Sequence, residues 1–408
     1  MARRYLRAAA RPPDLVTPGP GDSPLAAAAA PGRAHRAVAS TARAAADQQL
    51  VAEGGRSVAE EQALSPRGWR GRGLRTGEAS VLLVVSIDTE EDNWSRSRSA
   101  VTVENIAELP RLDALLRRLG VRATYFTTYH VAADSRARDI LRGVRDGGQA
   151  EIGAHLHPWN TPPLDEAFTP RHSMLKNLPP TLQLAKLERL TAVLEAAFGA
   201  PPTAFRAGRY GLGPDTVAAL IRCGYRVDSS VTPFVSWEET DQGPTFVGAP
   251  LGAYRLDGRG DVRVPVPEGP LTEVPLSCGF SRSPFAVWGA IWRLLRAQPL
   301  RPLRLGGVAA RAGLVQRIML SPELASVDEM LHLSAMLLRE GLRHLHLSWH
   351  SPSLQPGLSP FVSTAADVQR LYGAIEKYVE GLRAMTSVRS VTVTEAATVL
   401  ALHRQVPA

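Results

Sequence analysis

The segment Val81–Asp92 reads VLLVVSIDTEED, and its pattern predicts the fold of the chain. An apolar, mostly β-branched run leads directly into acids, which is typical of a strand buried on both faces of a mainly parallel sheet. Asp88, Glu90, Glu91 and Asp92 follow at its carboxyl end, where α/β folds gather ligands and catalytic groups. Acids packed this closely repel one another, and a bound cation would relieve that repulsion.

Strand-like and helix-like segments alternate downstream, which predicts βα units and a parallel sheet. Regular alternation weakens between about 234 and 317, so we expect an insertion there that shapes a substrate cleft. The expected strands are Arg122–Thr128, Ala150–His157, Thr203–Ala207, Tyr225–Ser229, Val262–Val266, Gln316–Leu320, His344–Trp349 and Val388–Val393. The expected helices are Val103–Leu119, Ala133–Arg145, Leu182–Phe198, Pro214–Cys223, Pro284–Ala297, Val327–Arg339 and Thr364–Ala384, with one more at the end of the chain.

These elements predict a distorted (β/α) barrel with about seven parallel strands, spanning residues 79–408. Residues 1–78 are rich in Ala, Arg, Gly and Pro and poor in large apolar residues. Such a segment buries too little surface to offset its ordering entropy, so we expect a disordered tail. A start codon assigned too far upstream is the alternative explanation for it.

Composition excludes several classes of protein. The formal charge of +8 is concentrated in residues 1–80, where twelve Arg and seven acids give +5, and no basic helix with interleaved aromatics accompanies it. We therefore expect no nucleic-acid partner. No stretch is apolar enough for a membrane span, and no apolar run follows Arg3–Arg4 as a signal would require. Two distant cysteines give no disulfide framework, so a cytoplasmic location is expected. No protein partner is predicted.

Further candidate residues stand at the ends of later strands. His155 and His157 in EIGAHLHPW are two residues apart and would face the same side of an extended strand. Two imidazoles with one carboxylate form a common catalytic metal set. Arg206 follows a short strand in FRAGRYG, Asp228 ends another, and His350 ends the strand LHLSWH. Taken singly, each also has an ordinary structural explanation, such as a solvated turn, an ion pair or a packed core histidine.

In this order the motifs resemble the NodB-type polysaccharide deacetylases over roughly 81–400. The resemblance implies that Asp88 is the catalytic base, that Glu90 and His155 bind a divalent metal, and that Arg206 holds Asp88. It further implies that His350 is the catalytic acid and that Asp228 supports it. The implied metal is zinc, with cobalt or manganese as alternatives.

The chain departs from the family pattern at three places. Trp159 stands where the second metal-binding histidine is usual, so His157 is expected to substitute for it. Thr89 replaces the second acid of the usual Asp-Asp pair. One extra residue precedes Tyr210 in the arginine motif. We also expect Tyr210 and Trp159 to stack on sugar rings, although large aromatic residues are more often part of the core.

The resemblance implies metal-dependent hydrolysis of an N-acetyl group on a sugar of a bacterial glycan or glycan precursor, releasing acetate. An acetylated carbohydrate is thus the expected substrate. Two alternatives remain open from the sequence. One is a barrel amidohydrolase acting on a small non-sugar amide, and the other is a catalytically silent glycan-binding module.

Overall fold

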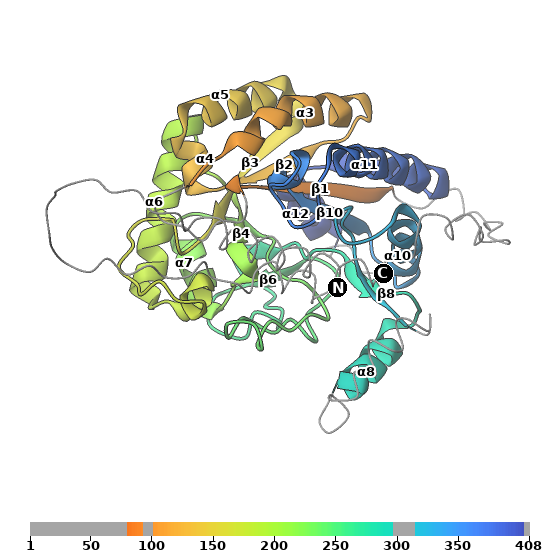
Figure 1. Cartoon of the computed structure of the whole chain (residues 1–408). Helices are drawn as coiled ribbons and strands as arrows, with labels where there is room; N and C mark the ends of the chain where they lie inside the picture. The colour runs from red at the N-terminus through yellow and green to blue at the C-terminus, as the bar shows by residue number, and fades with distance from the viewer. Residues whose placement is uncertain (1–79, 93–100, 297–314, 404–408) are drawn as a thin grey trace, which may run out of the picture. The chain divides into compact units, whose positions relative to one another are not determined.

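A computed structural model describes residues 80–92, 101–296 and 315–403, all of which belong to one compact unit. The prediction for residues 1–78 lies outside this part of the chain. The main sheet has the strand order β10-β1-β2-β3-β4-β5-β7-β6, and β11 pairs with β1 beside β2 (Figure 1). Its strands are β1 (Val81–Thr89), β2 (Ala123–Thr127), β3 (Ala150–Leu156), β4 (Ala204–Ala207), β5 (Val227–Asp228), β6 (Tyr254–Leu256), β7 (Leu271–Glu273), β10 (His344–His350) and β11 (Val388–Val391).

Every pairing in this sheet is parallel except that of β6 with β7. A separate antiparallel pair, β8 (Cys278–Phe280) and β9 (Arg317–Met319), continues the wall towards β10. The Leu320 N–H donates to the carbonyl of Ser277, and the Ser348 N–H donates to the carbonyl of Leu320. These bonds bring the wall round to β10, so the distorted, nearly closed β/α barrel predicted from the sequence is confirmed.

Helices cover the outside of the barrel, except that one covers its end and one extends away from it (Figure 1). They are α3 (Leu109–Arg118), α4 (Tyr129–Ala133), α5 (Ser135–Val144), α6 (Pro180–Phe198), α7 (Pro214–Arg222), α8 (Phe285–Arg296), α10 (Val327–Arg339), α11 (Ala365–Met385) and α12 (Val393–His403). Two expectations need correction. Val262–Val266 lies in turns rather than in a strand. The segment expected as an insertion supplies β7, which pairs with β5 in the main sheet.

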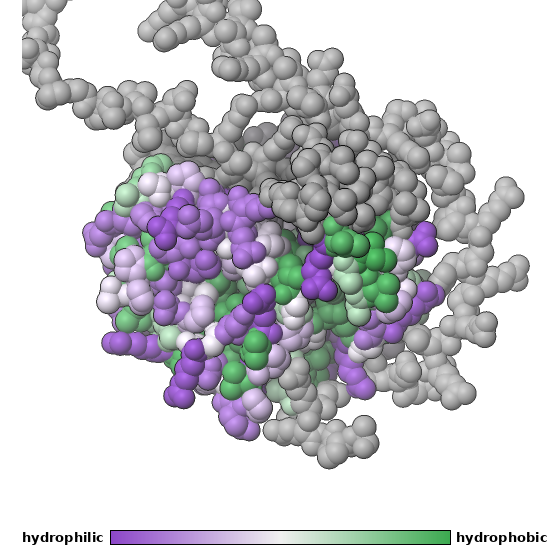
Figure 2. Space-filling model, turned by 90° about the horizontal axis from the view of Figure 1, so that it is seen from below, coloured by the Kyte–Doolittle hydropathy of each residue, from purple (hydrophilic) through white to green (hydrophobic). Residues whose placement is uncertain are grey.

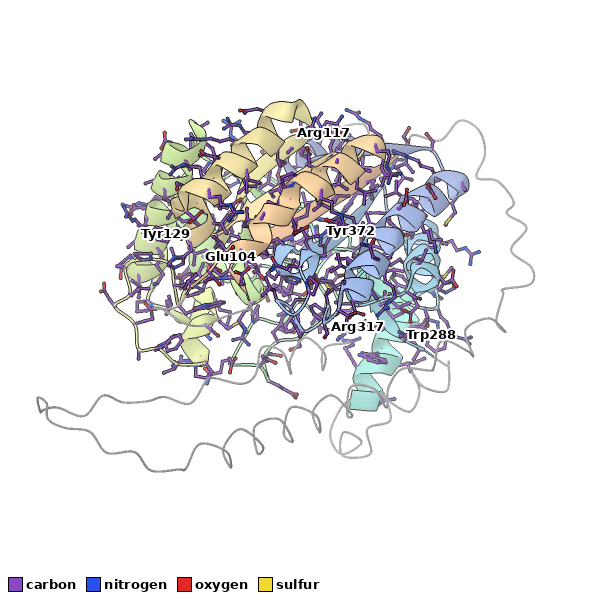
Figure 3. All side chains as sticks on the ribbon, turned by 45° about the horizontal axis from the view of Figure 1, so that its top comes forward. Glu104, Arg117, Tyr129, Trp288, Arg317 and Tyr372 are labelled. Carbon is purple, nitrogen blue, oxygen red and sulfur yellow. The ribbon has the colours of Figure 1, made fainter. Side chains whose placement is uncertain are left out.

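Helices α3 and α11 pack side by side on the outer face, where Arg111 lies over the ring of Tyr372 at 4.3 Å (Figure 3). Arg117 of α3 donates to the carbonyls of Val144 and Gly147, which ties α3 to the end of α5. Within the described ranges, no helix is both long and apolar enough to cross a membrane.

The period-two alternation of β1 decides which of its side chains reach the barrel interior. Leu83, Val85 and Ile87 join the outer core beneath the helices. Leu82 and Val84 instead join an inner cluster with residues of α12. Because side chains alternate along a strand, Ser86 and Asp88 continue the inward row. The apolar inner cluster therefore fills one end of the barrel, and polar side chains occupy the carboxyl end of the strands.

Candidate active site

Asp88 and Arg206 form a buried ion pair at the carboxyl end of the barrel. The Asp88 side chain is 5% exposed and that of Arg206 is 0% exposed, and Nη1 of Arg206 lies 2.5 Å from Oδ1 of Asp88. A buried ion pair of this kind is weak evidence for stability, because desolvation of both charges offsets much of their attraction. It does fix the orientation of Asp88, since one of its oxygens is engaged and the other is left facing the site.

The guanidinium of Arg206 is itself fully surrounded by hydrogen-bond acceptors. Its Nε donates to the carbonyl of Ser229 at 2.9 Å, and its Nη atoms donate to Ser348 Oγ, Ser86 Oγ and Ser229 Oγ at 2.8–3.1 Å. Its plane also lies 4.4 Å from the centre of the Phe126 ring. Rigid holding of this kind suits the planar, multi-donor arginine better than a lysine.

Three ligand-type side chains converge beside this pair: Glu90, His155 and His157. Their ligand atoms all lie within 4.8 Å of one another, and all three residues are buried. Oε2 of Glu90 lies 3.4 Å from Nε2 of His155 and 3.1 Å from Nε2 of His157. The predicted same-side placement of the two histidines is therefore confirmed. Glu90 comes directly after β1, and its N–H is anchored by Ser351 Oγ.

The other nitrogen of each histidine ring is held by an acceptor. Nδ1 of His155 donates to the carbonyl of Arg206 at 3.0 Å, and Nδ1 of His157 pairs with Oε2 of Glu91 at 2.9 Å. With Nδ1 protonated, Nε2 of a neutral imidazole is a bare acceptor. The two Nε2 atoms lie only 3.1 Å apart and next to the carboxylate of Glu90. This arrangement favours binding of a cation between them.

Electrostatics agree with a site that favours positive charge. Burial opposes ionisation of Glu90, but hydrogen bonds from His155 and His157 outweigh it and hold its pKa well below the ordinary range. Burial likewise opposes the charging of His157, yet the charge of Glu91 and hydrogen bonds to Glu90 and Glu91 raise its pKa to about 10. In the absence of another cation, the proton on His157 supplies the positive charge that the carboxylates require.

His350 lies across the site from these ligands, on the strand that pairs with β1. Its Nδ1 lies 2.8 Å from Oε2 of Glu323, and its backbone N–H donates to Oε1 of the same carboxylate. Burial lowers the pKa of His350, but the Glu323 charge and hydrogen bond, with smaller effects of Glu90 and Asp88, raise it to about 9. His350 is therefore cationic at neutral pH and able to give up a proton.

The prediction that Asp228 supports His350 is wrong, because Glu323 occupies that place. Val227 belongs to the inner cluster and Ser229 reaches Arg206, so alternation turns Asp228 to the opposite face. There Asp228 accepts hydrogen bonds from the N–H and Oγ of Ser230. Burial and the neighbouring Asp228 raise the pKa of Glu273. Asp228 and Glu273 therefore hold a proton between them, on the face of the sheet opposite to Arg206.

Asp88 occupies the centre of the constellation. Its Oδ2 lies 4.0 Å from Nε2 of His155 and 3.8 Å from Nε2 of His350. A carboxylate that is oriented by Arg206 thus stands between a cation-favouring cluster and a protonated imidazole. This order of groups can take a proton on one side of a substrate and deliver one on the other.

Trp159 and Tyr210 are engaged in packing. The Trp159 ring stacks on His157 with centroids 4.3 Å apart and is 6% exposed. Tyr210 stacks on Trp237 at 5.4 Å and is 3% exposed. Trp159 thereby helps to hold a candidate metal ligand in place. That either ring stacks on a sugar stays a prediction.

The turn after β4 presses against His157. Arg209 and Tyr210 adopt left-handed backbone angles, with φ of 55° and 58°, which costs about 1–3 kcal/mol each and is typical of functional sites. Arg209 is tied down by Asp241 at 2.6 Å. A Cβ on Gly208 would lie 2.5 Å from Cδ2 of His157, so only glycine leaves room for the ring here.

Two members of the site were not assigned roles from the sequence. Glu91 stands in the acidic run after β1, so its position was visible, although its pairing with His157 was not. Glu323 follows β9 in a segment without any motif, and only the closure of the barrel brings it to His350. No sequence signal distinguishes it from the other acids of the chain.

The comparisons with known proteins point to one family. The family model described as polysaccharide deacetylase matches residues 99–227, a span that holds His155, His157 and Arg206. No curated protein matches the sequence.

Among solved structures, a protein from Mycobacterium smegmatis assigned to the polysaccharide deacetylases aligns at 16% identity and a TM-score of 0.47, covering 82% of this chain and 95% of its own. A protein from Parabacteroides distasonis assigned as a glycoside hydrolase/deacetylase aligns at 14% identity and a TM-score of 0.49, covering 81% and 72%. The family 4 acetyl xylan esterase from Clostridium thermocellum, solved with a cobalt ion, aligns at 13% identity and a TM-score of 0.37, covering 78% and 91%. Over residues 99–227, the chain is thus similar to the polysaccharide deacetylases.

Proposed function

We propose that this protein removes an acetyl group from the nitrogen of a sugar by metal-dependent hydrolysis, releasing acetate. One observation carries the proposal: Oδ2 of Asp88 lies between the Glu90, His155 and His157 cluster and His350. A solvated turn or a set of structural ion pairs has no need of a base and an acid on opposite sides of one space.

The side chains present suit a divalent metal. Glu90, His155 and His157 supply one carboxylate oxygen and two imidazole nitrogens, a set that zinc takes in hydrolytic sites. The acceptors on both Nδ1 atoms leave the Nε2 lone pairs for the ion. When bound, the metal would polarise the acetyl carbonyl and increase the acidity of a nearby water. Cobalt and manganese are alternatives for the same donors.

The protein groups then divide the proton transfers. Asp88, oriented by Arg206, takes a proton from the water that attacks the acetyl carbon. Breaking the C–N bond leaves a strongly basic amine, which requires a proton as it departs. His350, protonated because of Glu323, donates that proton from Nε2. The products are acetate and a free amino sugar, so atoms and charges balance.

We further propose that the substrate is an N-acetylated sugar of a bacterial glycan or of its precursor. The family match supports a carbohydrate, and the acid opposite the base supports an amide, whose amine needs a proton to leave. Acetylated chito-oligosaccharides are suitable first substrates, because they present many equivalent N-acetyl groups in soluble form.

The test is acetate release from chito-oligosaccharides by protein loaded with zinc, cobalt or manganese. Asp88→Asn is expected to abolish release while keeping the metal, because Asp88 is not among the three ligands. Asp215→Asn, the same substitution at an exposed aspartate, serves as the control and should keep full activity. Acetate release by Asp88→Asn, or by protein stripped of metal, would contradict the proposal. Hydrolysis of a small cyclic amide but not of the sugar would favour the amidohydrolase alternative.

A further inference from the structure

Helix α8 has an apolar face that the described part of the protein leaves uncovered. One side of the helix is anchored: Phe285 is buried against Phe280, with ring centroids 6.0 Å apart, and Trp292 lies 6.1 Å from the same ring. On the other side, Val287 is 50% exposed and Leu294 is 62% exposed. These two residues are seven apart, so they lie on one stripe of the helix.

The helix stands away from the barrel strands in Figure 1, joined to them through β8. Figure 2 views the molecule from the side towards which α8 extends and shows apolar side chains clustered at one edge of the coloured surface. Contiguous apolar surface of this kind usually marks a binding site, whereas single exposed apolar residues do not.

All charged residues in the segment of sequence that contains this stripe are positively charged. Between Glu273 and Glu323 the sequence contains seven arginines and no acidic residue or lysine. Among these arginines, Arg282 before the helix and Arg293 within it are exposed. Glu340 accepts the Phe285 N–H at the amino-terminal end and so caps the helix there.

A tryptophan with an arginine above it completes the pattern. Arg282 lies 5.5 Å from the ring of Trp288, which Figure 3 labels on α8. Arg317 lies 5.9 Å from the Trp292 ring, but it is 8% exposed and belongs to the anchored side of the helix. Tryptophan and arginine are the residues that occupy the boundary between lipid headgroups and acyl chains, the one by its amphipathic ring and the other by snorkelling. An apolar stripe flanked by such residues is typical of helices that lie in a membrane surface.

We propose that α8 docks this protein on an anionic lipid bilayer, with Val287 and Leu294 inserted at the boundary and the arginines on the headgroups. Charge decides among the possible occupants. A second copy of the chain would set arginine against arginine, whereas anionic headgroups complement the basic run. This inference goes beyond the proposed deacetylation and does not depend on it, because binding is measured without substrate.

The test is sedimentation of the full chain with vesicles of phosphatidylcholine alone or mixed equally with phosphatidylglycerol. We expect binding to the anionic vesicles that weakens as salt is added, and little to the neutral ones. The double variant Val287→Asp, Leu294→Asp should reduce binding at least about tenfold, since it removes two inserted side chains. Both residues are exposed, so folding should be unaffected.

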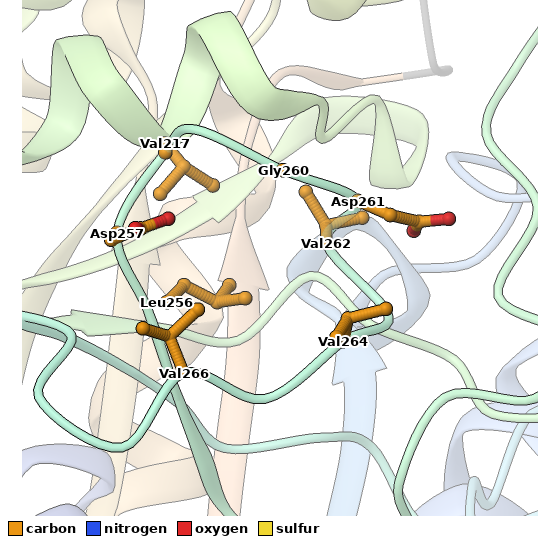
Figure 4. Close-up of a pocket in the computed structure, with 9 residues that line it drawn as sticks. Val217, Leu256, Asp257, Gly260, Asp261, Val262, Val264 and Val266 are labelled. Atoms are coloured by element: carbon orange, nitrogen blue, oxygen red, sulfur yellow. The ribbon is translucent and has the colours of Figure 1, made fainter.

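A matched control is available at Val264, which is 58% exposed and lines a small pocket of about 160 Å³ in the loop after β6 (Figure 4). Val264→Asp should bind vesicles as the wild type does. Equal loss in this control, or absence of binding to anionic vesicles, would overturn the proposal. So would a dimer in gel filtration that the double variant dissolves, because the stripe would then belong to a second copy.

Discussion

Replacing Glu323 by glutamine should move the alkaline limit of activity to lower pH. The amide keeps the size of the side chain but removes the charge that lies 2.8 Å from Nδ1 of His350. That charge and its hydrogen bond are the largest influences that raise the pKa of His350 to about 9 against the effect of burial. Without them, burial should return the pKa to the ordinary imidazole value or below it.

The size of the effect follows from the two pKa values. At pH 8 a group with a pKa of about 9 is ~90% protonated, whereas one with a pKa of about 6.5 is ~3% protonated. The acid form of His350 is thus depleted ~30-fold at pH 8 and by less than about twofold at pH 6. The sign follows from a raised pKa: the proton is present below it and is lost as the pH rises through it.

The measurement is the pH profile of kcat/KM for acetate release, in wild type and Glu323→Gln. A cation near Glu90 lowers the pKa of His350 in both proteins, so the difference between the two profiles is the relevant quantity. Asp228→Asn is the matched control, because Asp228 lies on the opposite face of its strand and should leave the alkaline limit where it is. A limit that moves with Asp228 and stays with Glu323 would refute the assignment.

Three further outcomes are expected. Glu91→Gln should weaken zinc binding about 10–100-fold, measured by competition with a chromophoric chelator, since it removes the charge that orients His157; unchanged affinity would exclude that role. Gly208→Ala should lower zinc affinity at least about tenfold in the same assay, because its Cβ displaces the His157 ring; full affinity would mean that the turn yields instead. Lys186→Met should cost about 3–5 kcal/mol in urea unfolding, because the lysine is 0% exposed and pairs with a buried carboxylate. The exposed Lys377→Met is its control, and equal stability of the two variants would contradict the expected cost.

Local patterns determined much of the barrel. The apolar run of β1, the amphipathic helices and the turns between them are periodic over short distances, so they could be located from the sequence alone. Helix α10 begins and ends where the pattern predicted, at Val327 and Arg339. The irregular stretch between α7 and α10 was harder, because its strands have only two or three residues each and are held by pairing rather than by propensity.

The candidate site divides in the same way. Asp88, Glu90, His155, His157, Arg206 and His350 stand at strand ends, and a parallel barrel gathers strand ends at one rim whatever its loops do. Their proximity could therefore be predicted once the strands were recognised. His155 lies in β3 and His157 directly follows the strand, and their spacing of two residues along extended chain predicted their common direction.

What the tertiary structure alone decided is the support for these residues. Two features decide whether Asp228 or Glu323 pairs with His350. One is which face of the two-residue strand β5 points into the barrel, and the other is where the β8–β9 pair places the loop that follows β9. Neither is encoded in local periodicity, because both arise from long-range pairing. The sequence by itself thus determined the barrel and the residues at its rim, and only folding decided which acid holds each histidine.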